Sequence, residues 1–535
     1  MKQFEVKRKQ IEYLSKALEV ILFLAIERKL GLEGSGFFLV PLMLFAMIWN
    51  FAGEQLPDVL AKLIRVRKAK GQLKSIKNIR LFSLICQVAM GVVGTLLMLS
   101  LGTFLGENVY GCPYASLMIW ILSPVIFLRG MSYLLQGYCQ GEGSELPTVV
   151  TCLLRPVTIY LLGTVLGSLG GDYGQKVTGL LKQEHYTAMY VGAGWCAAIT
   201  IAELVIILFL FFSFLGAKKL RAKPEQEMVK ASVSFRSYVS AASKNMAFRA
   251  IVSFTELFPV CIGMIIYYHR EGETAPLTYG TFFVGYFAMC LLIYRLLNSV
   301  AVPFWSKIGS YFKRDELRLG RVCFQGGIHM ILGLGMILAV SIAAMPAQVG
   351  ALAGFTSPNL TKLVFQGSLW LVFAGLGFYF SRTLMRFGKN LLVAGIGILT
   401  DILFVMVFMI LWNDEKMALL SMMYALLISE AIHCFLIGAI ATQMLGCRLN
   451  WFRTVLLPIG LAVAIGILQA LCVKFMGEHL ESIFVVIIVG GAGFIAYWCI
   501  LILLRNFSEE ELSVSPFGKS IKVFGDMMGI YEKLE

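Results

Sequence analysis

The chain has 535 residues, of which 58% are hydrophobic and only 15% are charged. This composition is far more apolar than that of an ordinary soluble domain, which excludes a soluble globular protein. The net charge of +14 would suggest a nucleic acid partner in a soluble protein. Here the basic residues gather in alternate short loops, a pattern that orients membrane proteins, so we expect contact with lipid headgroups and no nucleic acid.

Apolar runs of about 20 residues recur along the whole chain, each long enough to cross a ~30 Å hydrocarbon layer as a helix. They lack the short alternation that is typical of barrel strands. The sequence therefore predicts an all-α polytopic membrane protein with about fourteen transmembrane helices. The expected spans are 11–30, 37–64, 81–104, 115–139, 147–168, 187–215, 236–267, 279–304, 322–345, 360–385, 389–412, 417–444, 453–475 and 482–505.

Lysine and arginine are concentrated in every second connection between these spans. The N-terminal segment, the run 65–80, the connection 217–230 and the C-terminal tail belong to the basic set. The intervening loops are poor in both residues. By the positive-inside rule this alternation places both termini in the cytoplasm.

The longest cytoplasmic connection is charged and contains Pro224, and we interpret it as the boundary between two six-helix lobes. The last two spans stand outside these lobes. No loop is long enough for a further globular domain. The predicted organisation is an N-terminal lobe at 1–215, a linker at 216–235, a C-terminal lobe at 236–445, helices 13 and 14 at 446–505 and a cytoplasmic tail at 506–535.

Two segments of the first half have an echo in the second half. The segments 36–80 and 280–321 both begin with a glycine and an aromatic pair, cross an apolar span, reach a proline and end in a basic run. The first of these spans carries Glu54 and the second carries Arg295. Both segments therefore follow one plan.

In the other echo, the segment after the fourth span is similar to the segment after the tenth span. Counted from Gly143 and Gly388, the positions of Arg155 and of Thr400 and Asp401 correspond. Two echoes in the same order predict a duplicated protein of the parallel-repeat kind, with a pseudo-two-fold arrangement and a site between the halves.

Charged side chains interrupt several of the apolar spans at helical spacing. A charge near the bilayer centre costs roughly 2.5–3.5 kcal/mol on insertion scales, so each should face a partner or a wet interior. The spacing places the polar residues on one side of each helix, which favours a shared hydrated cavity. The stripes are Glu12, Lys16 and Glu19; Asn50, Glu54, Asp58 and Lys62; Arg129, Gln136 and Gln140; Lys244, Asn245, Arg249 and Glu256; and Arg295, Asn298 and Ser299.

Basic residues in both halves are our candidates for binding a substrate head group in this cavity. They are Arg129, Arg155, Arg249, Arg295 and Lys16. The guanidinium group binds phosphate oxygens bidentately, so these residues favour an anionic phosphate head, such as the head of a lipid.

The alternative is that these arginines only pair with carboxylates of neighbouring helices. The possible partners are Glu203, Glu256, Asp401 and Glu430. Acidic residues inside the spans could also couple transport to a cation. The candidates for that role are Glu54, Asp58, Glu256 and Asp401.

The twelve cysteines are scattered through apolar spans with no paired spacing, which indicates small core residues and neither a metal site nor a disulfide framework. His329 and His433 stand alone in the sequence and are interpreted as packed residues. We expect no cofactor.

The chain resembles the multidrug/oligosaccharidyl-lipid/polysaccharide (MOP) flippase superfamily. It is most similar to the polysaccharide-biosynthesis and stage V sporulation protein B branch, which is related to lipid II flippases. The resemblance extends over nearly the whole chain. It is carried by KLGLEGSGFF, QLPDVLAKLIRVRKAKG, LLQGYCQGEGSELPTVV, YRLLNSVAVPFWSKIGSYFKRDELRLG and TLMRFGKNLLVAGIGILTDI, in that order.

The resemblance implies a transporter that moves an undecaprenyl-pyrophosphate-linked sugar from the inner to the outer leaflet by alternating access. It implies two lobes in a V, a bacterial inner membrane, cell-envelope polysaccharide export and, for this chain, a monomer. Family flippases use basic residues in a central cavity, and Arg295 is the position that we match first. A coupling cation would be a further partner.

Two other classes of function remain as alternatives. A cation-coupled multidrug exporter of the same superfamily would prefer an acidic, aromatic-lined cavity. A membrane glycosyl ligase or polymerase would need catalytic groups on a large outer loop, and the loop 169–186 offers only Asp172, Glu184 and His185 without a recognisable spacing. We therefore expect a transporter and no enzyme activity.

Overall fold

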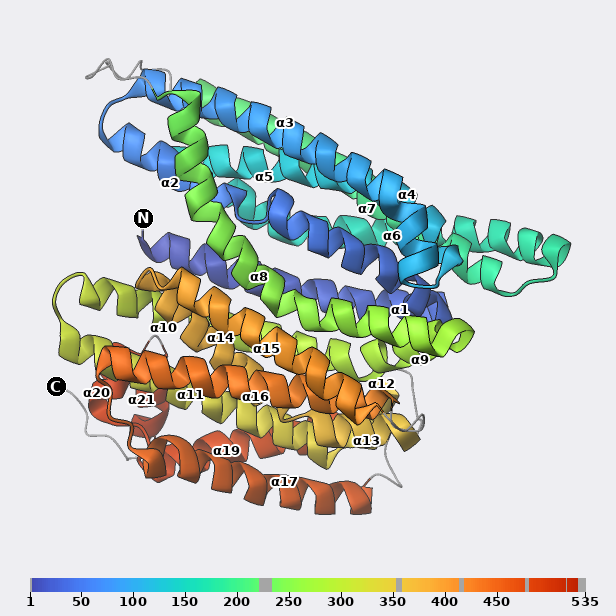
Figure 1. The fold of residues 1–535 in the computed structure, drawn as a ribbon. Coiled ribbons are helices and arrows are strands. Elements are labelled where there is room, and N and C mark those ends of the chain that lie inside the picture. The colour runs from blue at the N-terminus through green and yellow to red at the C-terminus, as the bar shows by residue number, and fades with distance from the viewer. Residues whose placement is uncertain are drawn as a thin grey trace. The chain divides into compact units, whose positions relative to one another are not determined.

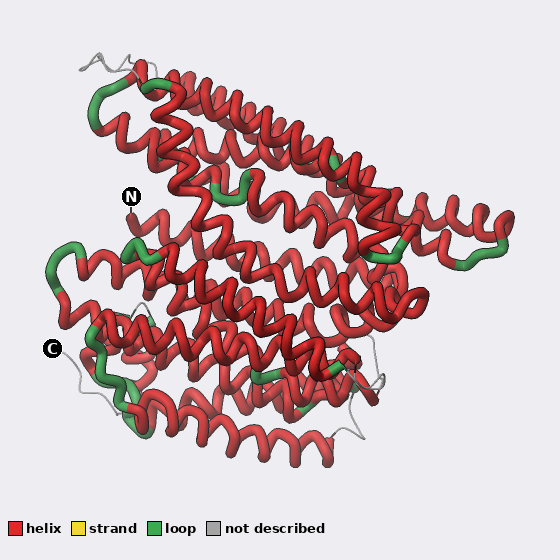
Figure 2. Tube along the Cα trace, in the orientation of Figure 1, coloured by secondary structure: helices red, strands yellow, loops and turns green. Residues whose placement is uncertain are grey.

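In a computed structural model of the protein, residues 2–220, 233–352, 358–412, 418–476, 481–515 and 517–527 are described. Helices account for nearly all of this part of the chain, and it contains no strand (Figure 2). The all-α prediction is therefore confirmed.

Within these described ranges, eleven helical segments are long and apolar enough to cross a membrane, or up to twelve if a bent pair, Thr361–Gly367 and Trp370–Arg386, forms one span. The protein is thus a multi-pass membrane protein. The count of fourteen spans stays a prediction. It differs because the span expected at 11–30 carries several charges, and because the single run Phe235–Phe312 contains two of the expected spans.

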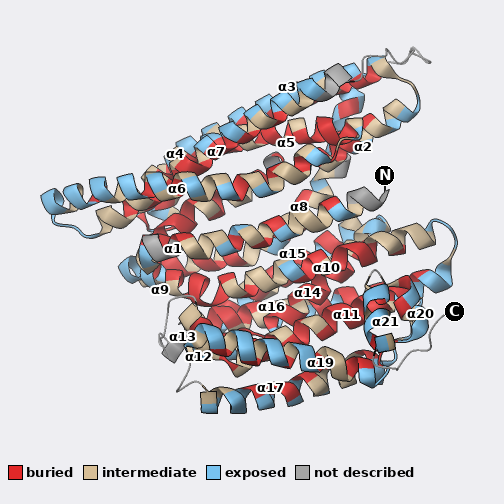
Figure 3. Ribbon diagram, turned by 180° about the vertical axis from the view of Figure 1, so that it is seen from behind, coloured by how far each residue is buried: buried red, intermediate tan, exposed pale blue. Residues whose placement is uncertain are grey.

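The outward faces of the helices are apolar, as expected for contact with lipid. Leu81, Val93 and Leu96 on α3 (Leu73–Phe104) are 53%, 56% and 57% exposed. The opposite face of α3 is buried and carries glycines and serines. Figure 3 shows exposed residues running along the outer side of α3. Large exposed apolar faces of this kind mark a surface that is covered in the native environment.

By packing, the chain divides into a first unit, Met1–Gly280, and a second unit, Thr281–Glu535. The first unit includes α8, which contacts α1, α2 and α3. The boundary expected at 216–235 therefore differs from the limits of these units. Most of that linker lies outside the described residues, and the lobe boundaries stay a prediction.

The described part of the first unit is built of helices, most of them long (Figure 1). They are α1 (Lys2–Ala52), α2 (Leu56–Ala69), α3 (Leu73–Phe104), α4 (Ser116–Leu122), α5 (Pro124–Glu142), α6 (Leu146–Leu181), α7 (His185–Leu220), α8 (Phe235–Glu271) and α9 (Ala275–Phe282), which crosses the boundary. α1 is kinked at Gly31, whose φ of 73° favours glycine.

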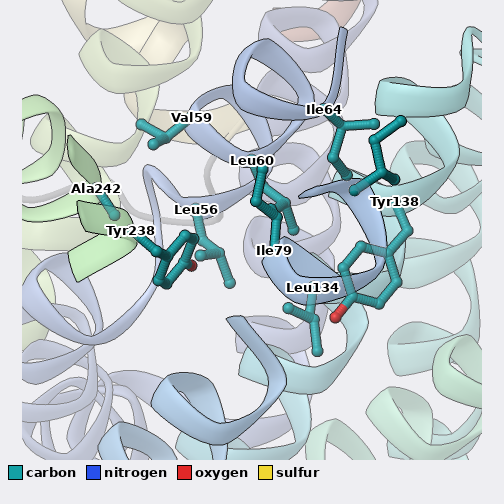
Figure 4. Close-up of a cluster of buried hydrophobic side chains, with 10 residues drawn as sticks. Leu56, Val59, Leu60, Ile64, Ile79, Leu134, Tyr138, Tyr238 and Ala242 are labelled. Atoms are coloured by element: carbon teal, nitrogen blue, oxygen red, sulfur yellow. The ribbon is translucent and has the colours of Figure 1, made fainter. Parts of the chain in front are cut away.

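A cluster of buried side chains from α2, α3, α5 and α8 forms one core of the first unit (Figure 4). Leu60, Ile64 and Ile79 are at most 2% exposed in it. The hydroxyl of Tyr138 donates to the carbonyl of Arg80 at 2.6 Å. The polar atom of this large aromatic residue is therefore satisfied inside the cluster.

The hairpin of α6 and α7 is packed through glycines. A Cβ on Gly163 would lie 1.9 Å from the ring of Trp195, and a Cβ on Gly194 would lie 2.3 Å from the carbonyl oxygen of Leu166. The missing side chains let the two backbones approach closely. This approach sets α6 and α7 side by side along their length, with Arg155 on one helix and Glu203 on the other.

The second unit is also helical. It contains α10 (Ala288–Phe312), α11 (Leu317–Ala344), α12 (Pro346–Leu352), α13 (Pro358–Gly367), α14 (Trp370–Arg386), α15 (Asn390–Leu411), α16 (Ala418–Leu445), α17 (Leu457–Met476), α18 (Ser482–Val485), α19 (Gly491–Leu503), α20 (Glu509–Val514) and α21 (Gly518–Met527). The expected helices 13 and 14 correspond to α17 and to α18 with α19, and they pack in the same unit as α11.

The backbone has the same conformation at Gly143 and Gly388, the two glycines from which the second echo in the sequence was counted. Gly143 follows α5 with a φ of 94°, and Gly388 follows α14 with a φ of 78°. Both values lie in the left-handed region where glycine commonly ends a helix. α6 and α15 start just after these turns, so Arg155 and Asp401 lie at similar depths in corresponding helices.

Candidate functional site

Two of the predicted arginines meet at one carboxylate in the first unit. The Nε of Arg129 on α5 donates to Oε1 of Glu203 on α7 at 2.6 Å. The Nε of Arg155 on α6 lies 2.9 Å from the same oxygen, and its Nη2 lies 3.4 Å from Oε2. Glu203 is 0% exposed. Because two guanidinium groups share one carboxylate, the ion pairs of this set contain one more base than acid, while Glu19 on α1 also acts electrostatically on Arg155. We call Arg129, Arg155 and Glu203 the arginine cluster.

Aromatic rings complete the surroundings of the arginine cluster. The guanidinium of Arg129 lies 4.9 Å from the centre of the Phe45 ring, and that of Arg155 lies 5.3 Å from the Tyr133 ring. Ser132 accepts a hydrogen bond from Nη2 of Arg155 at 3.2 Å. The side chain of Arg129 is 19% exposed, against 8% for Arg155. Arg129 is therefore the more accessible of the two.

The other predicted basic residues lie elsewhere. Arg249 is half-buried on α8, and Arg295 lies on α10 in the second unit, with its guanidinium 5.4 Å from the centre of the Tyr294 ring. Lys16 on α1 pairs with Glu54 at 3.4 Å. The structure thus brings Arg129 and Arg155 together through the pairing with Glu203, which the sequence offered as the alternative. A head-group role for all five residues stays a prediction.

A second set of ion pairs ties the start of α1 to other helices of the first unit. Nη2 of Arg8 lies 2.9 Å from Asp58 Oδ1, and Nε of Arg8 lies 2.8 Å from Glu145 Oε2. Arg8 is only 3% exposed. Lys9 also pairs with Asp58 at 3.0 Å, and Arg65 pairs with Glu145. We call this set the Arg8 network.

Sequence reasoning missed the Arg8 network because the N-terminal segment resembled a basic loop. The structure instead begins α1 at Lys2, so Arg8 lies on a helix. The available signal was the four-residue spacing of Arg8 and Glu12, which also pair. The predicted coupling residue Asp58 is thereby neutralised by two bases, and its coupling role stays a prediction.

The second unit contains a polar cluster of different sign. Asp401 on α15 is 7% exposed, and it interacts electrostatically with Glu430 on α16. Nδ1 of His433 lies 3.2 Å from Thr400 Oγ1, and Nε2 lies 3.4 Å from Ser381 Oγ on α14. We call these five residues the carboxylate cluster.

Asp401 differs from Glu203 in its ion pairing. In the part of the chain that the structure describes, no lysine or arginine forms a salt bridge with Asp401. A Cβ on Gly377 of α14 would lie 3.0 Å from Glu430 Oε1, so the bare glycine makes room for that carboxylate. His433, interpreted from the sequence as a lone packed residue, is in fact held between two hydroxyl groups.

Glu256, the remaining candidate for ion coupling, lies on an exposed side of α8. Its role stays a prediction. Among the described residues, no group of three or more His, Cys, Asp and Glu side chains is placed to hold a metal ion. The chemistry visible in both clusters is ion pairing and hydrogen bonding.

Comparison with known proteins shows what the chain as a whole is similar to. No protein-family model matches the sequence. One curated relative, stage V sporulation protein B of Bacillus subtilis (strain 168), is 24% identical over 198 residues, which are 37% of this chain and 36% of the relative. The match therefore spans only about a third of the relative's length.

Solved structures match over most of the chain. A multidrug resistance MATE family transporter of the MOP superfamily in an inward-facing conformation has a TM-score of 0.62 and 14% identity, covering 81% of this chain and 94% of its own. A MOP superfamily transporter from Pyrococcus furiosus, whose binding pocket is described as reversed in polarity, has a TM-score of 0.59 and 15% identity, covering 82% and 95%.

The TM-scores and coverages establish that this chain has the fold of the MOP superfamily transporters it matches. The resemblance inferred from the sequence motifs is confirmed as a resemblance, because these structures share the fold and the curated relative is similar over part of its sequence. The matched structures are of transporters. Which substrate this chain moves is a separate question.

Proposed function

We propose that this transporter flips a lipid-linked oligosaccharide, of the undecaprenyl-pyrophosphate-sugar type, for the export of cell-envelope polysaccharide. It would work as a monomer by alternating access in a bacterial inner membrane, with both termini in the cytoplasm. The observation that carries the proposal is the excess of base over acid in the ion pairs of the arginine cluster, because a pyrophosphate head needs a positive site inside the membrane.

The electrostatics of the arginine cluster support an anionic cargo. The two guanidinium groups share Glu203, so their ion pairs contain one more base than acid in a region of low dielectric constant, with Glu19 also acting electrostatically on Arg155. Arg129 is the more exposed partner and its guanidinium can still offer donors to phosphate oxygens. A drug cation would be repelled by the same cluster.

A matched pair of substitutions tests this role without orphaning a buried carboxylate. Arg129→Gln removes the additional base and leaves Glu203 paired with Arg155, whereas Arg129→Lys keeps the charge. In proteoliposomes that contain a fluorescent lipid-linked pyrophosphate sugar, we expect Arg129→Gln to lower the flipping rate at least about tenfold, the loss of one charge-assisted contact. Arg129→Lys should retain most of the rate. Equal rates for both variants and the unsubstituted protein would remove the arginine cluster from the mechanism.

We further propose that the carboxylate cluster couples this movement to a cation, most simply a proton. Two carboxylates that face each other away from water repel, and a proton shared between them relieves the repulsion. Because Asp401 and Glu430 lie on different helices, gain or loss of that proton would change how α15 and α16 pack. Asp401→Asn should therefore abolish the response of flipping to an imposed pH gradient. Flipping that still follows the gradient in this variant would contradict the coupling role.

Export of organic cations is the second candidate, and the carboxylate cluster is the observation that favours it. The structural neighbours include multidrug transporters, and an acidic site suits a cationic drug. Competition separates the two candidates. An organic cation that inhibits flipping and is itself transported, with a rate that survives Arg129→Gln but not Asp401→Asn, would favour the exporter.

A further inference from the structure

The last helix among the described residues, α21, presents three large apolar side chains outward, while its Ile521 is half-buried. Gly518 and Gly525 are buried and form the side of α21 that faces the protein. Val523, Phe524 and Met527 are 55%, 41% and 80% exposed. A helix that folds in water normally shows the reverse arrangement, with its large apolar residues packed inward.

Close packing explains why glycine occupies the inner side. A Cβ on Gly518 would lie 1.6 Å from the carbonyl oxygen of Leu512 in α20, so no larger residue fits there. α21 also contacts α19. The helix is therefore fixed with one face against the protein, and its apolar face points away from it.

The segment that leads into α21 is tied firmly to the second unit. Asn506 hydrogen-bonds the buried His329 of α11 at 2.6 Å, and the Phe507 ring stacks on the same histidine at 4.3 Å. Ser508 caps α20 in a reciprocal capping box with Glu511. Lys307 of α10 donates to the carbonyl of Val514 at 2.8 Å. These contacts hold α21 in a defined place.

α21 packs against α19, which is the last part of a helical run that is suited to cross the membrane. The apolar run Ser482–Leu503 ends with Leu503 and Leu504, both 55% exposed, and is followed at once by the exposed Arg505. Apolar side chains followed by an arginine mark the passage from hydrocarbon to headgroups. Because α21 packs against this helix, it lies near the membrane surface.

The two helices of the C-terminal tail, α20 and α21, differ in the charges that they expose. α20 carries the exposed acidic residues Glu509 and Glu510. On α21, Lys519 is exposed in line with Val523 and Met527 at four-residue spacing, and Lys522 and Asp526 are half-buried. An anionic bilayer surface would repel the face of α20 and attract the lysines of α21.

We propose that α21 is an interfacial anchor, which lies on the headgroup layer and inserts Val523, Phe524 and Met527 among the acyl chains of an anionic membrane. Amphipathic helices with basic flanks bind bilayers in this way. A protein partner or a second copy fits less well, because three side chains cover far less than the roughly 1,000 Å² that a specific interface buries.

Site-resolved cysteine labelling of the full-length protein tests the anchor. Val523→Cys probes α21, and Ser513→Cys, on an exposed position of α20, is the matched control. Each variant is placed as a single copy in nanodiscs of phosphatidylcholine alone or with 30% phosphatidylglycerol, about the anionic content of a charged leaflet. Reaction with a bulky membrane-impermeant maleimide is followed by peptide mass spectrometry, so that the native cysteines do not interfere.

We expect Val523→Cys to react at least about tenfold more slowly than Ser513→Cys in the anionic nanodiscs, with weaker protection in phosphatidylcholine. Adding Lys519→Gln should speed the reaction of Val523→Cys about fivefold in anionic nanodiscs and little in neutral ones. Equal reaction of the two cysteines in both membranes would overturn the anchor. Equal protection in both membranes would overturn its preference for anionic lipid, and protection that appears only with several copies per disc would assign the face to self-association.

Discussion

The arginine cluster and the carboxylate cluster lie on corresponding helices of the two units, yet they combine charges of different sign. In the first unit a base on α6 meets an acid on α7. In the second unit an acid on α15 meets another acid on α16. Corresponding helices therefore hold two bases at one shared acid in the first unit and two acids that act on each other in the second.

This difference shows what two helices that begin at the same kind of turn can vary. The glycine turns at Gly143 and Gly388 set the same start for α6 and α15, and so they fix the depth of the polar residue that follows. The identity of that residue remains free, as arginine in one unit and as threonine with aspartate in the other. The backbone fixes how far along the helix the polar residue lies, and the side chain determines the sign of its charge.

The largest expected effect comes from removing the acid in each cluster. Glu203→Gln removes the buried carboxylate that two guanidinium groups share, which should cost about 3–5 kcal/mol of stability. Asp401→Asn removes a repulsion with Glu430, so it should be neutral or stabilising. Thermal unfolding of the detergent-purified variants measures both, and a similar loss in the two would mean that the clusters do not differ in charge compensation.

The next largest effect on stability is expected from a comparison of one arginine in each unit, one buried and one exposed. Arg8 of the first unit is 3% exposed and pairs with three carboxylates, whereas Arg318 of the second unit pairs with Glu510 while their side chains are 80% and 59% exposed. Arg8→Gln should lower stability by about 2–3 kcal/mol, because charged hydrogen bonds are lost in a buried place.

Arg318→Gln is the control for this substitution. It should change stability by about 0–1 kcal/mol, because exposed ion pairs contribute little. Both values come from denaturant or thermal unfolding under the same detergent conditions. A loss for Arg318→Gln as large as that for Arg8→Gln would show that burial is not what gives the Arg8 network its weight.

The smallest effects are expected from glycines that make room for the two clusters. Gly163→Ala puts a methyl group against the fully buried Trp195 ring, which should cost about 1–3 kcal/mol. Gly377→Ala meets the end of the Glu430 side chain at 3.0 Å and the His433 ring at 3.3 Å, and the gain in helix propensity of up to about 1 kcal/mol offsets the displacement. The thermal midpoint should fall in the first variant and stay nearly level in the second, and a reversed order would refute the packing argument.

The candidate site was only partly predictable. Helical spacing pointed to Arg129 and Arg155 as deep polar residues, and Glu203 was among their possible partners. The spacing could not show that one carboxylate serves both arginines, because that depends on three helices meeting at one level. His433 had no signal at all, since its two hydroxyl partners come from other helices.

By itself the sequence determined that this protein spans a membrane with many helices, because a residue's transfer between water and hydrocarbon depends on its own chemistry and on its nearest neighbours in the chain. It also indicated which helices carry polar faces. Only the tertiary structure decided the pairings, such as Arg8 with Glu145 and Arg129 with Glu203, which join residues far apart in the chain. Coulomb energy depends on distance in space, and that distance is set by how the helices pack.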